Sequence, residues 1–417
     1  MERFDVVVIG GGAAGMLASA VAAEGGARVL LLERNANPGK KLRITGKGRC
    51  NVTNDCTIAE AIEKIPNGGK FLNSAFNAFS PQDAMALFEG LGLPLKTERG
   101  NRVFPHSDNA SDVVAALTRY MDVAGVEFRP GRALEILSEN GRVASVKSSV
   151  GAVGCSSAIL ATGGLSYPAT GSTGDGYKMA QKLGHTIAPL RGSLVPLEAE
   201  PEVCGRMQGL ALKNVRLSAF DCGKKPVYEE LGELLFTHFG ISGPLALSAS
   251  AHMSDFAHNE YHVLIDFKPA LDEKKLDLRI LRDFEKYSNR DFSNALVDLL
   301  AKLSIPVIVE KSGIPPETKV RSISREQRLG LVRLLKSFRI DIIGPRPVDE
   351  AIITSGGVDL KEINPKTMES KLVKDLYFAG EIIDADAYTG GFNLQIAWST
   401  AAAAARSAAY AGNTERR

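Results

Sequence analysis

The first 34 residues constrain the fold most, because they place a glycine-rich turn between an apolar strand and a helix. Residues 4–9 form an apolar run, residues 10–15 read Gly-Gly-Gly-Ala-Ala-Gly, and residues 28–33 form a second apolar run that ends in an acid. A strand, a G-x-G-x-x-G turn, a helix and a second strand in this order are typical of a dinucleotide-binding unit. The sequence therefore predicts a Rossmann-like α/β fold.

Each part of this pattern has a mechanical role. We expect Gly10 to allow the tight turn, Gly12 to let the backbone approach a pyrophosphate, and Gly15 to let the helix pack closely on the sheet. The helix N-terminus then points at the phosphates. Glu33, at the end of the second strand, is expected to bind the hydroxyl groups of an adenosine ribose.

Composition limits the classes of partner and compartment. The chain has 417 residues, a net charge of +2 and 6% aromatic residues, so we expect neither nucleic acid nor a membrane as a partner. The five cysteines form no C-x-x-C pair, which favours reduced thiols in the cytoplasm and no metal site. The chain enters its first strand directly, and the alanine-rich residues 401–411 are too weakly apolar to span a membrane. The oligomeric state and the substrate do not follow from the sequence.

Hydrophobic periodicity gives the domain organisation. It predicts helices over 81–90 and 111–124, and a hairpin with an Asn-Gly turn at 140–141. From about residue 190 the pattern changes to strands and then to charged helices, and sheet character resumes after Pro345. We therefore expect a discontinuous nucleotide-binding domain, residues 1–189 and 344–417, with an inserted domain of residues 190–343.

Two further segments near the C-terminus favour FAD over NAD. Residues 376–379 form an apolar strand that closes on Gly380 and Glu381, where the carboxylate could bind a sugar-alcohol chain. Residues 389–395 start the last helix, whose free backbone N–H groups would stabilise the negative charge of a reduced flavin. The three segments occur in the order that an FAD-binding domain requires.

Six sequence blocks carry a resemblance to a known family. They are residues 8–15, 39–54, 161–168, 170–176, 236–244 and 380–395. The chain resembles the BaiN and aminoacetone-oxidase-like family of bacterial flavoproteins, which are NAD(P)/FAD-dependent oxidoreductases. The resemblance implies bound FAD, a glutathione-reductase-like nucleotide domain, and an inserted β-barrel plus helical domain.

Residues 40–51 hold five cations, which are expected to wrap the pyrophosphate and the flavin, although some must be solvated. Within this loop we interpret Cys50 as a small packing residue. The expected FAD contacts are Gly10, Gly12, Ala13, Ala14, Gly15, Glu33, Arg34, Lys40, Lys41, Thr45, Gly46, Gly48, Arg49, Cys50, Asn51, Ala161, Thr162, Gly163, Gly380, Glu381, Gly391, Phe392, Asn393 and Leu394.

The catalytic machinery is less defined by the sequence. His238, before a glycine-rich turn and Pro244, could donate a proton to substrate, or it could be a buried turn histidine. Asp175 is expected to cap the helix that follows residues 173–176.

We expect hydride transfer between flavin N5 and a small organic substrate, at the interface of the FAD domain and the insert. NAD(P)H, bound transiently, or oxygen would complete the cycle. The alternatives are an amine or α-carbon oxidase, a fumarate-reductase-like reductase of C=C bonds, a flavin-dependent RNA-modifying protein, and a flavin-binding structural protein.

Overall fold

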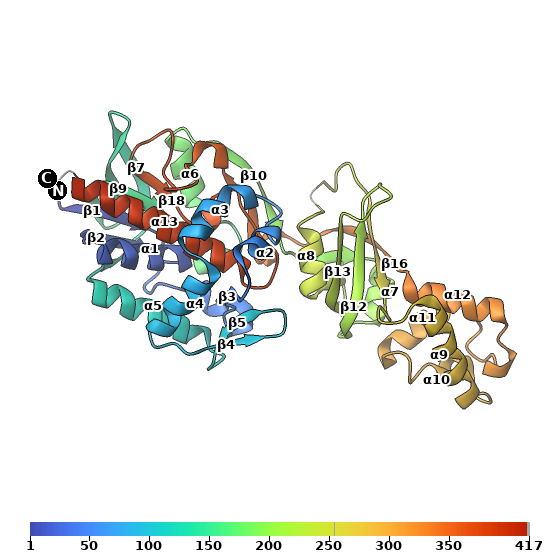
Figure 1. Ribbon diagram of the computed structural model, residues 1–417. Helices are drawn as coiled ribbons and strands as arrows, with labels where there is room; N and C mark the ends of the chain where they lie inside the picture. Colours follow the sequence, from blue (N-terminus) through green and yellow to red (C-terminus); the bar gives the residue numbers. More distant parts are fainter. Residues whose placement is uncertain (254, 415–417) are drawn as a thin grey trace. The chain divides into compact units, whose positions relative to one another are not determined.

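The chain folds into two compact units. The computed structural model describes residues 1–253 and 255–414, and it separates residues 1–193 and 348–417 from residues 194–347 (Figure 1). We call the first the nucleotide unit and the second the insert, and each is described by itself.

A seven-stranded mixed sheet forms the centre of the nucleotide unit. Four strands run parallel to β1, and β7, β8 and β9 form an antiparallel meander. Asn140 and Gly141 both have positive φ, 52° and 76°, as a two-residue hairpin turn requires, so the predicted hairpin is confirmed. The order is β6 (Glu127–Pro130), β2 (Val29–Glu33), β1 (Arg3–Ile9), β9 (Gly151–Leu160), β8 (Arg142–Ser148) and β7 (Ala133–Glu139), and β18 (Leu376–Phe378) pairs with the end of β9.

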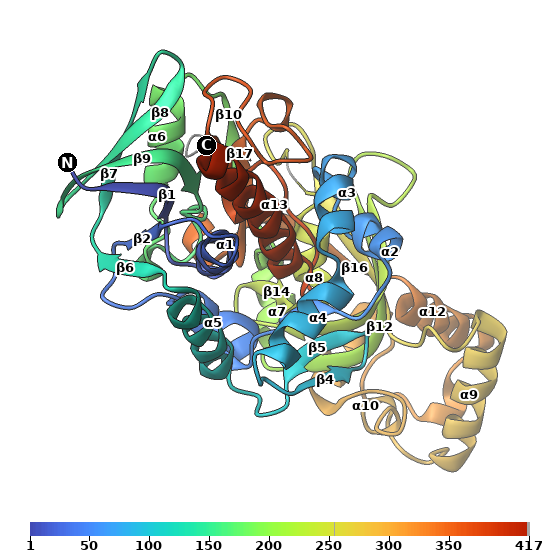
Figure 2. The ribbon, with the colours of Figure 1, turned by 60° about the vertical axis from the view of Figure 1, so that its left-hand side comes forward.

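Alternate residues of β1 face the two sides of the sheet. Val6 and Val8 pack with the helices α1 (Ala13–Glu24), α5 (Ala110–Ala124) and α13 (Phe392–Thr414), whereas Val7 and Ile9 belong to the core on the opposite face. Figure 2 shows α1 and α13 next to each other against the sheet. Among the described residues, none of the helices combines the length and apolar character that crossing a membrane requires.

Short elements complete the nucleotide unit. Capping boxes at Thr57 and Ser80 fix the starts of α2 and α4, and the predicted helix over 81–90 is confirmed. The small sheet β3–β5–β4 follows the cationic loop, and β10 pairs antiparallel with β17. The bounds are α2 (Ile58–Glu63), α3 (Gly69–Ala78), α4 (Pro81–Gly90), β3 (Thr53–Asn54), β4 (Leu95–Glu98), β5 (Arg102–Pro105), α6 (Asp175–Lys182), β10 (Ile187–Ser193) and β17 (Ile353–Val358).

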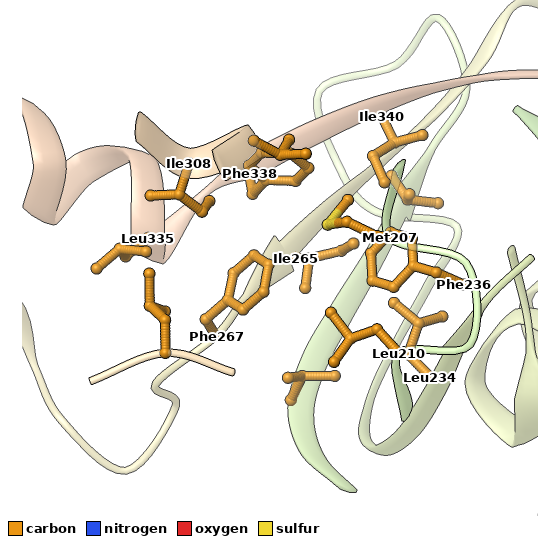
Figure 3. Packing of buried hydrophobic residues seen from close by; sticks show 14 of the residues in the cluster. Met207, Leu210, Leu234, Phe236, Ile265, Phe267, Ile308, Leu335, Phe338 and Ile340 are labelled. Atoms are coloured by element: carbon orange, nitrogen blue, oxygen red, sulfur yellow. The ribbon is translucent and has the colours of Figure 1, made fainter. Parts of the chain in front are cut away.

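The insert is a closed six-stranded barrel with a helical segment between β15 and β16, as predicted. One hydrophobic core continues from the barrel into the helices: Ile265 and Ile340 lie near Phe338, whose ring meets Phe267 at 5.6 Å, and Leu335 extends the core (Figure 3). The strands are β11 (Leu197–Ala199), β12 (Ala211–Phe220), β13 (Tyr228–Phe236), β14 (Gly240–Ser242), β15 (Tyr261–Asp266) and β16 (Phe338–Pro345). The helices are α7 (Pro201–Arg206), α8 (Gly243–Ser250), α9 (Glu273–Lys286), α10 (Phe292–Ala295), α11 (Ile305–Ser312) and α12 (Arg325–Lys336).

Candidate cofactor site

The glycine turn between β1 and α1 contains two packed glycines and one open one. A Cβ on Gly10 would lie 2.6 Å from the carbonyl oxygen of Ala161, and one on Gly15 would lie 1.8 Å from the carbonyl oxygen of Gly10. Gly12 is the N-cap of α1, and a Cβ there would meet nothing within 4 Å. The turn thus presents bare backbone and a helix N-terminus to open space, which fits the approach of a pyrophosphate.

Glu33 is held beside this turn. Its side chain is buried at the end of β2, and its Oε2 accepts a hydrogen bond of 2.7 Å from the backbone N of Gly11. Its Oε1 accepts from the backbone N and Nδ2 of Asn35, at 2.8 and 2.6 Å. The carboxylate is therefore fixed where a ribose ligand is expected, and Asn35 is a supporting residue that the motif did not indicate.

Arg34 and Asp175 form an ion-pair group next to the end of β2. Arg34 donates to Thr173 Oγ1 at 2.6 Å, and Arg132 donates to both carboxylate oxygens of Asp175 at 2.8 Å. The predicted capping role of Asp175 is wrong, because the N-cap of α6 is Gly174 with a φ of 77°. Asp175 is instead the first helical residue, and the hydrogen bond from Arg132 lowers its pKa.

The cationic loop folds as two short turns and leads back into the core. Left-handed backbone at Gly46 and Lys47 separates the turns, and the loop returns through Cys50, which also has a positive φ. Burial raises the pKa of the Cys50 thiol to about 12, so the thiol stays protonated at neutral pH. This state suits a packing residue and not a nucleophile.

Three cations of the loop bind protein groups. Lys40 Nζ donates to the carbonyl oxygen of Ala169 at 2.7 Å, and Lys41 Nζ lies 2.7 Å from a carboxylate oxygen of Glu381. Arg49 donates to Asp108 at 2.9 Å and also binds Glu98. Arg43 and Lys47 are exposed, as is Gly46. Some cations of the loop therefore hold other segments of the chain in place, and the loop is also a candidate cofactor contact.

Glu381 joins segments that are far apart in the sequence. Besides Lys41, its carboxylate accepts hydrogen bonds of 2.8 Å from Ser166 Oγ and from the backbone N of Thr354. The preceding Gly380 has a φ of 75°. The sequence suggested a sugar-alcohol ligand at Glu381. It placed Ser166 in a family block without indicating this contact, and it gave no signal for Thr354. The structure shows a carboxylate with three protein donors.

The start of α13 packs against Thr53 of β3, the strand that follows the cationic loop. A Cβ on Gly391 would lie 2.4 Å from the carbonyl oxygen of Thr53, and Thr53 Oγ1 donates to Gln395 Oε1 at 2.6 Å. Asn393 binds both the N and the O of Ala387, at 2.9 and 2.8 Å. The helix N-terminus that is expected to face the flavin is therefore rigidly placed.

Four of the predicted cofactor contacts, Gly10, Ala14, Ala161 and Gly380, lie together at one edge of the sheet. Gly10 lies against Ala161, and a Cβ on Gly380 would lie 2.9 Å from the Cβ of Ala14, so strands β1, β9 and β18 end together. Asn51 Oδ1 and Thr162 Oγ1 are buried and have no hydrogen-bond partner within the described residues. Buried polar atoms without partners are uncommon, and these two suit a polar cofactor.

Asp386 is a buried acid that sequence reasoning missed. Its Oδ2 accepts a 2.7 Å hydrogen bond from Ser193 Oγ, and its Oδ1 has no partner in the part of the chain that the structure describes. Burial raises the pKa of this carboxyl. Its neighbour Ala387 is the residue that Asn393 holds. Nothing in the sequence around Asp386 distinguishes it from an acid in a solvated turn.

His238 lies in the insert, in the turn between β13 and β14. Its side chain is exposed and meets the ring of Phe239 edge-on at 5.0 Å, so the alternative of a buried turn histidine is wrong. Its role as a proton donor stays a prediction. Within residues 1–253 and 255–414, no group of three or more His, Cys, Asp or Glu side chains could hold a metal.

Fold and site together define an FAD-dependent oxidoreductase with a Rossmann-like nucleotide domain. Residues 4–407 match the family described as HI0933-like protein Rossmann domain, and the chain belongs to this family. The expected resemblance is thus confirmed, and FAD is the cofactor that the family and the geometry support.

The relatives that match nearly the full chain include a ribosomal RNA dihydrouridine synthase and a bile acid reductase. The ribosomal RNA dihydrouridine synthase of Escherichia coli (strain K12) is 32% identical over 97% of this chain and 98% of its own length. The 3-dehydro-bile acid delta(4,6)-reductase of Clostridium scindens is 30% identical over 96% and 98%. The solved 3-ketosteroid-delta4-(5alpha)-dehydrogenase of Rhodococcus jostii RHA1 has a TM-score of 0.51 at 16% identity, covers 97% of each chain, and shows a shared fold.

Proposed function

We propose that this protein reduces carbon–carbon double bonds that are conjugated with a carbonyl group. The observation that carries the proposal is the full-length similarity to two proteins with different substrates but one bond type. Dihydrouridine is uridine with a reduced ring double bond next to a carbonyl. A 3-dehydro bile acid with delta-4,6 unsaturation has double bonds conjugated with its 3-oxo group.

The reaction is balanced by one hydride and one proton. When bound and reduced by NAD(P)H, FAD would supply the hydride, which the substrate takes at the carbon β to the carbonyl. The α carbon takes a proton from a protein group or from water. In this chain the bare backbone at Gly12 and the carboxylate of Glu33 would hold the dinucleotide end, and the start of α13 would favour the reduced cofactor.

NAD(P)H is the proposed reductant, bound transiently. The sequence has no second strand, G-x-G-x-x-G turn and helix that would form a permanent nicotinamide domain. Transient binding needs no such domain, because the nicotinamide can leave before the alkene binds. Reoxidation by oxygen is the competing way to complete the cycle.

Anaerobic stopped-flow absorbance of the FAD-loaded protein tests both half-reactions. NADPH or NADH should bleach the flavin, and 2-cyclohexenone should then restore its absorbance, whereas saturated cyclohexanone should not. If 2-cyclohexenone and a 4-en-3-one steroid both leave the reduced flavin unchanged, the proposed function is wrong. Bleaching by an amine alone would favour the amine oxidase alternative.

A further inference from the structure

Tyr167 has a backbone conformation that its residue type rarely adopts. Its φ of 54° and ψ of 58° lie in the left-handed region, which is unusual for a bulky side chain. The following Pro168 adds to the cost, because a residue before proline favours extended backbone. Strain of this kind persists only where the surrounding structure imposes it, and it is concentrated at active sites. The strain therefore points to a function for Tyr167.

Side chains from the segment after β2 hold the loop that contains Tyr167. Lys40 Nζ donates to the carbonyl oxygen of Ala169 at 2.7 Å, and Asn35 Nδ2 donates to that of Thr170 at 2.9 Å. Within the loop, the backbone N and Oγ1 of Thr170 donate to the carbonyl oxygen of Tyr167 at 2.8 and 2.7 Å. These hydrogen bonds fix the loop on both sides of its short turn, so the strained conformation is held in place.

The loop places Tyr167 beside groups that are expected to contact the cofactor. It begins at the end of β9, where β1 and β18 also end, and ligands of α/β proteins bind at this edge of the sheet. Lys41 Nζ lies 5.9 Å from the centre of the Tyr167 ring, and the neighbouring Ser166 binds Glu381 at 2.8 Å. Tyr167 is partly exposed, so a ligand at this edge can reach it.

The hydroxyl of Tyr167 differs from the polar groups around it. Ser166 donates its hydroxyl proton to Glu381, and proton loss from Lys41 would leave Glu381 without its cation. The Tyr167 hydroxyl has no hydrogen bond within residues 1–253 and 255–414. Its proton is therefore free for transfer, and tyrosine is one of the side chains that serve as general acids.

From this geometry we propose that Tyr167 donates the proton to the α carbon in the reduction of a conjugated alkene. The assignment rests on the proposed function. Hydride from the cofactor, reduced by NAD(P)H, forms the new C–H bond at the β carbon, and the electron pair of the C=C bond moves towards the carbonyl as an enolate. The α carbon then bonds to the proton of Tyr167, whose O–H electron pair stays on the oxygen. Lys41 stabilises this phenolate until water returns the proton.

Two other acids of the chain compete for this role. Asp386 is 2% exposed and already binds Ser193, so it could act on a substrate only through a relay. His238 belongs to the insert and is exposed. The experiment therefore measures His238→Ala beside the tyrosine variants.

Tyr167→Phe removes the proton and keeps the ring. Tyr410→Phe is the matched control, because it removes the hydroxyl of a tyrosine that is 75% exposed in the same unit. Anaerobic stopped-flow absorbance follows bleaching of the FAD-loaded proteins by NADPH and then recovery with 2-cyclohexenone or with trans-β-nitrostyrene. Hydride addition to the nitroalkene gives a nitronate, a stable anion that needs no proton from the protein.

Tyr167→Phe should slow recovery with 2-cyclohexenone by about 100-fold or more, which is the contribution of a general acid. Bleaching by NADPH and recovery with nitrostyrene should stay within about twofold of the wild type, as should all three rates in Tyr410→Phe. FAD content after desalting and the urea midpoint of Tyr167→Phe should match the wild type, because the lost hydroxyl has no protein partner.

The assignment is overturned if Tyr167→Phe slows recovery with both acceptors equally, since Tyr167 would then position a ligand and not donate a proton. It is also overturned if Tyr167→Phe loses FAD, or if His238→Ala alone shows the selective loss with 2-cyclohexenone. The wild type separates this inference from the proposed function. If 2-cyclohexenone does not restore wild-type flavin absorbance, the proposed function fails, whereas a wild-type rate in Tyr167→Phe overturns only the assignment of the proton donor.

Discussion

The nucleotide unit and the insert reach a defined structure by different means. In the nucleotide unit, glycines at Gly10, Gly15 and Gly391 bring backbone against backbone, and their added Cβ atoms would lie within 2.6 Å of carbonyl oxygens. In the insert, one hydrophobic core joins the barrel to the helices. The insert has a glycine contact of this kind in its barrel, where an added Cβ on Gly240 would lie 2.2 Å from the carbonyl oxygen of Leu197, but its helices have none. An added methyl group should therefore destabilise the glycine turns of the nucleotide unit strongly and the helices of the insert little, whereas the insert should be sensitive to loss of apolar volume.

The largest expected effect is a cavity in the insert. Phe338→Ala removes a fully buried ring that contacts Phe267, so we expect the insert to lose about 3–5 kcal/mol of unfolding free energy. Urea denaturation checks this value. Ile343→Ala, on the same strand but 63% exposed, should change stability by less than about 0.5 kcal/mol. If FAD content falls as stability does, the two units are less independent than the comparison implies.

Adding one methyl group should have different effects on stability at two glycines of the nucleotide unit. Gly15→Ala forces α1 away from Gly10, so we expect loss of FAD and about 3 kcal/mol of stability. Gly12→Ala has room for its Cβ, so the apoprotein should stay within about 1 kcal/mol of the wild type while FAD binding is lost. Flavin absorbance after desalting, together with urea unfolding, distinguishes the two. Normal FAD retention in Gly12→Ala would remove Gly12 from the cofactor site.

Breaking the hydrogen-bond network of Glu381 should lower the unfolding free energy less than Phe338→Ala or Gly15→Ala does. Glu381→Gln leaves Lys41 without its anion, and we expect a loss of about 2 kcal/mol. Lys41→Met and the double variant, which carries both substitutions, complete a double-mutant cycle that urea unfolding measures. Their effects should be non-additive by about 1 kcal/mol, since the side chains are in direct contact. Additive effects would mean that the 2.7 Å pair contributes no coupling.

A buried histidine gives the nucleotide unit a pH dependence. His185 has Nδ1 3.0 Å from Glu362 Oε2 and Nε2 2.9 Å from Ser370 Oγ, and burial lowers its pKa. The folded state therefore resists protonation, so its stability is complete above the unfolded pKa of about 6.5 and is lost as the pH falls through the lower folded value.

His185→Gln should flatten the decrease in unfolding free energy between about pH 7 and pH 5. Urea unfolding at several pH values measures it. His258→Gln, an exposed control, should leave the decrease unchanged. An unchanged slope in His185→Gln would assign the acid sensitivity to other groups.

Sequence patterns predicted the parts of the fold that are encoded locally. The Asn140–Gly141 turn and the helices over 81–90 and 111–124 depend on neighbouring residues, so periodicity and turn chemistry were sufficient. The inserted barrel and helical segment came from the family resemblance, and the structure confirms them.

The side-chain network of the site could not be predicted in the same way. Lys41 and Glu381 are 340 positions apart, and their pairing depends on how the whole sheet closes. Asp386 differs from a solvated acid only by its burial, which is a tertiary property.

The smallest expected change in unfolding free energy is at a glycine of the insert. Gly330 lies inside α12, and an added Cβ would meet nothing within 4 Å. Gly330→Ala should therefore raise the unfolding free energy by about 0.5–1 kcal/mol, because alanine loses less backbone entropy in a helix. Urea unfolding against the wild type measures the gain, and FAD content should not change. Destabilisation at this site would show that close backbone packing also governs the helices of the insert, and the contrast with Gly15→Ala would fail.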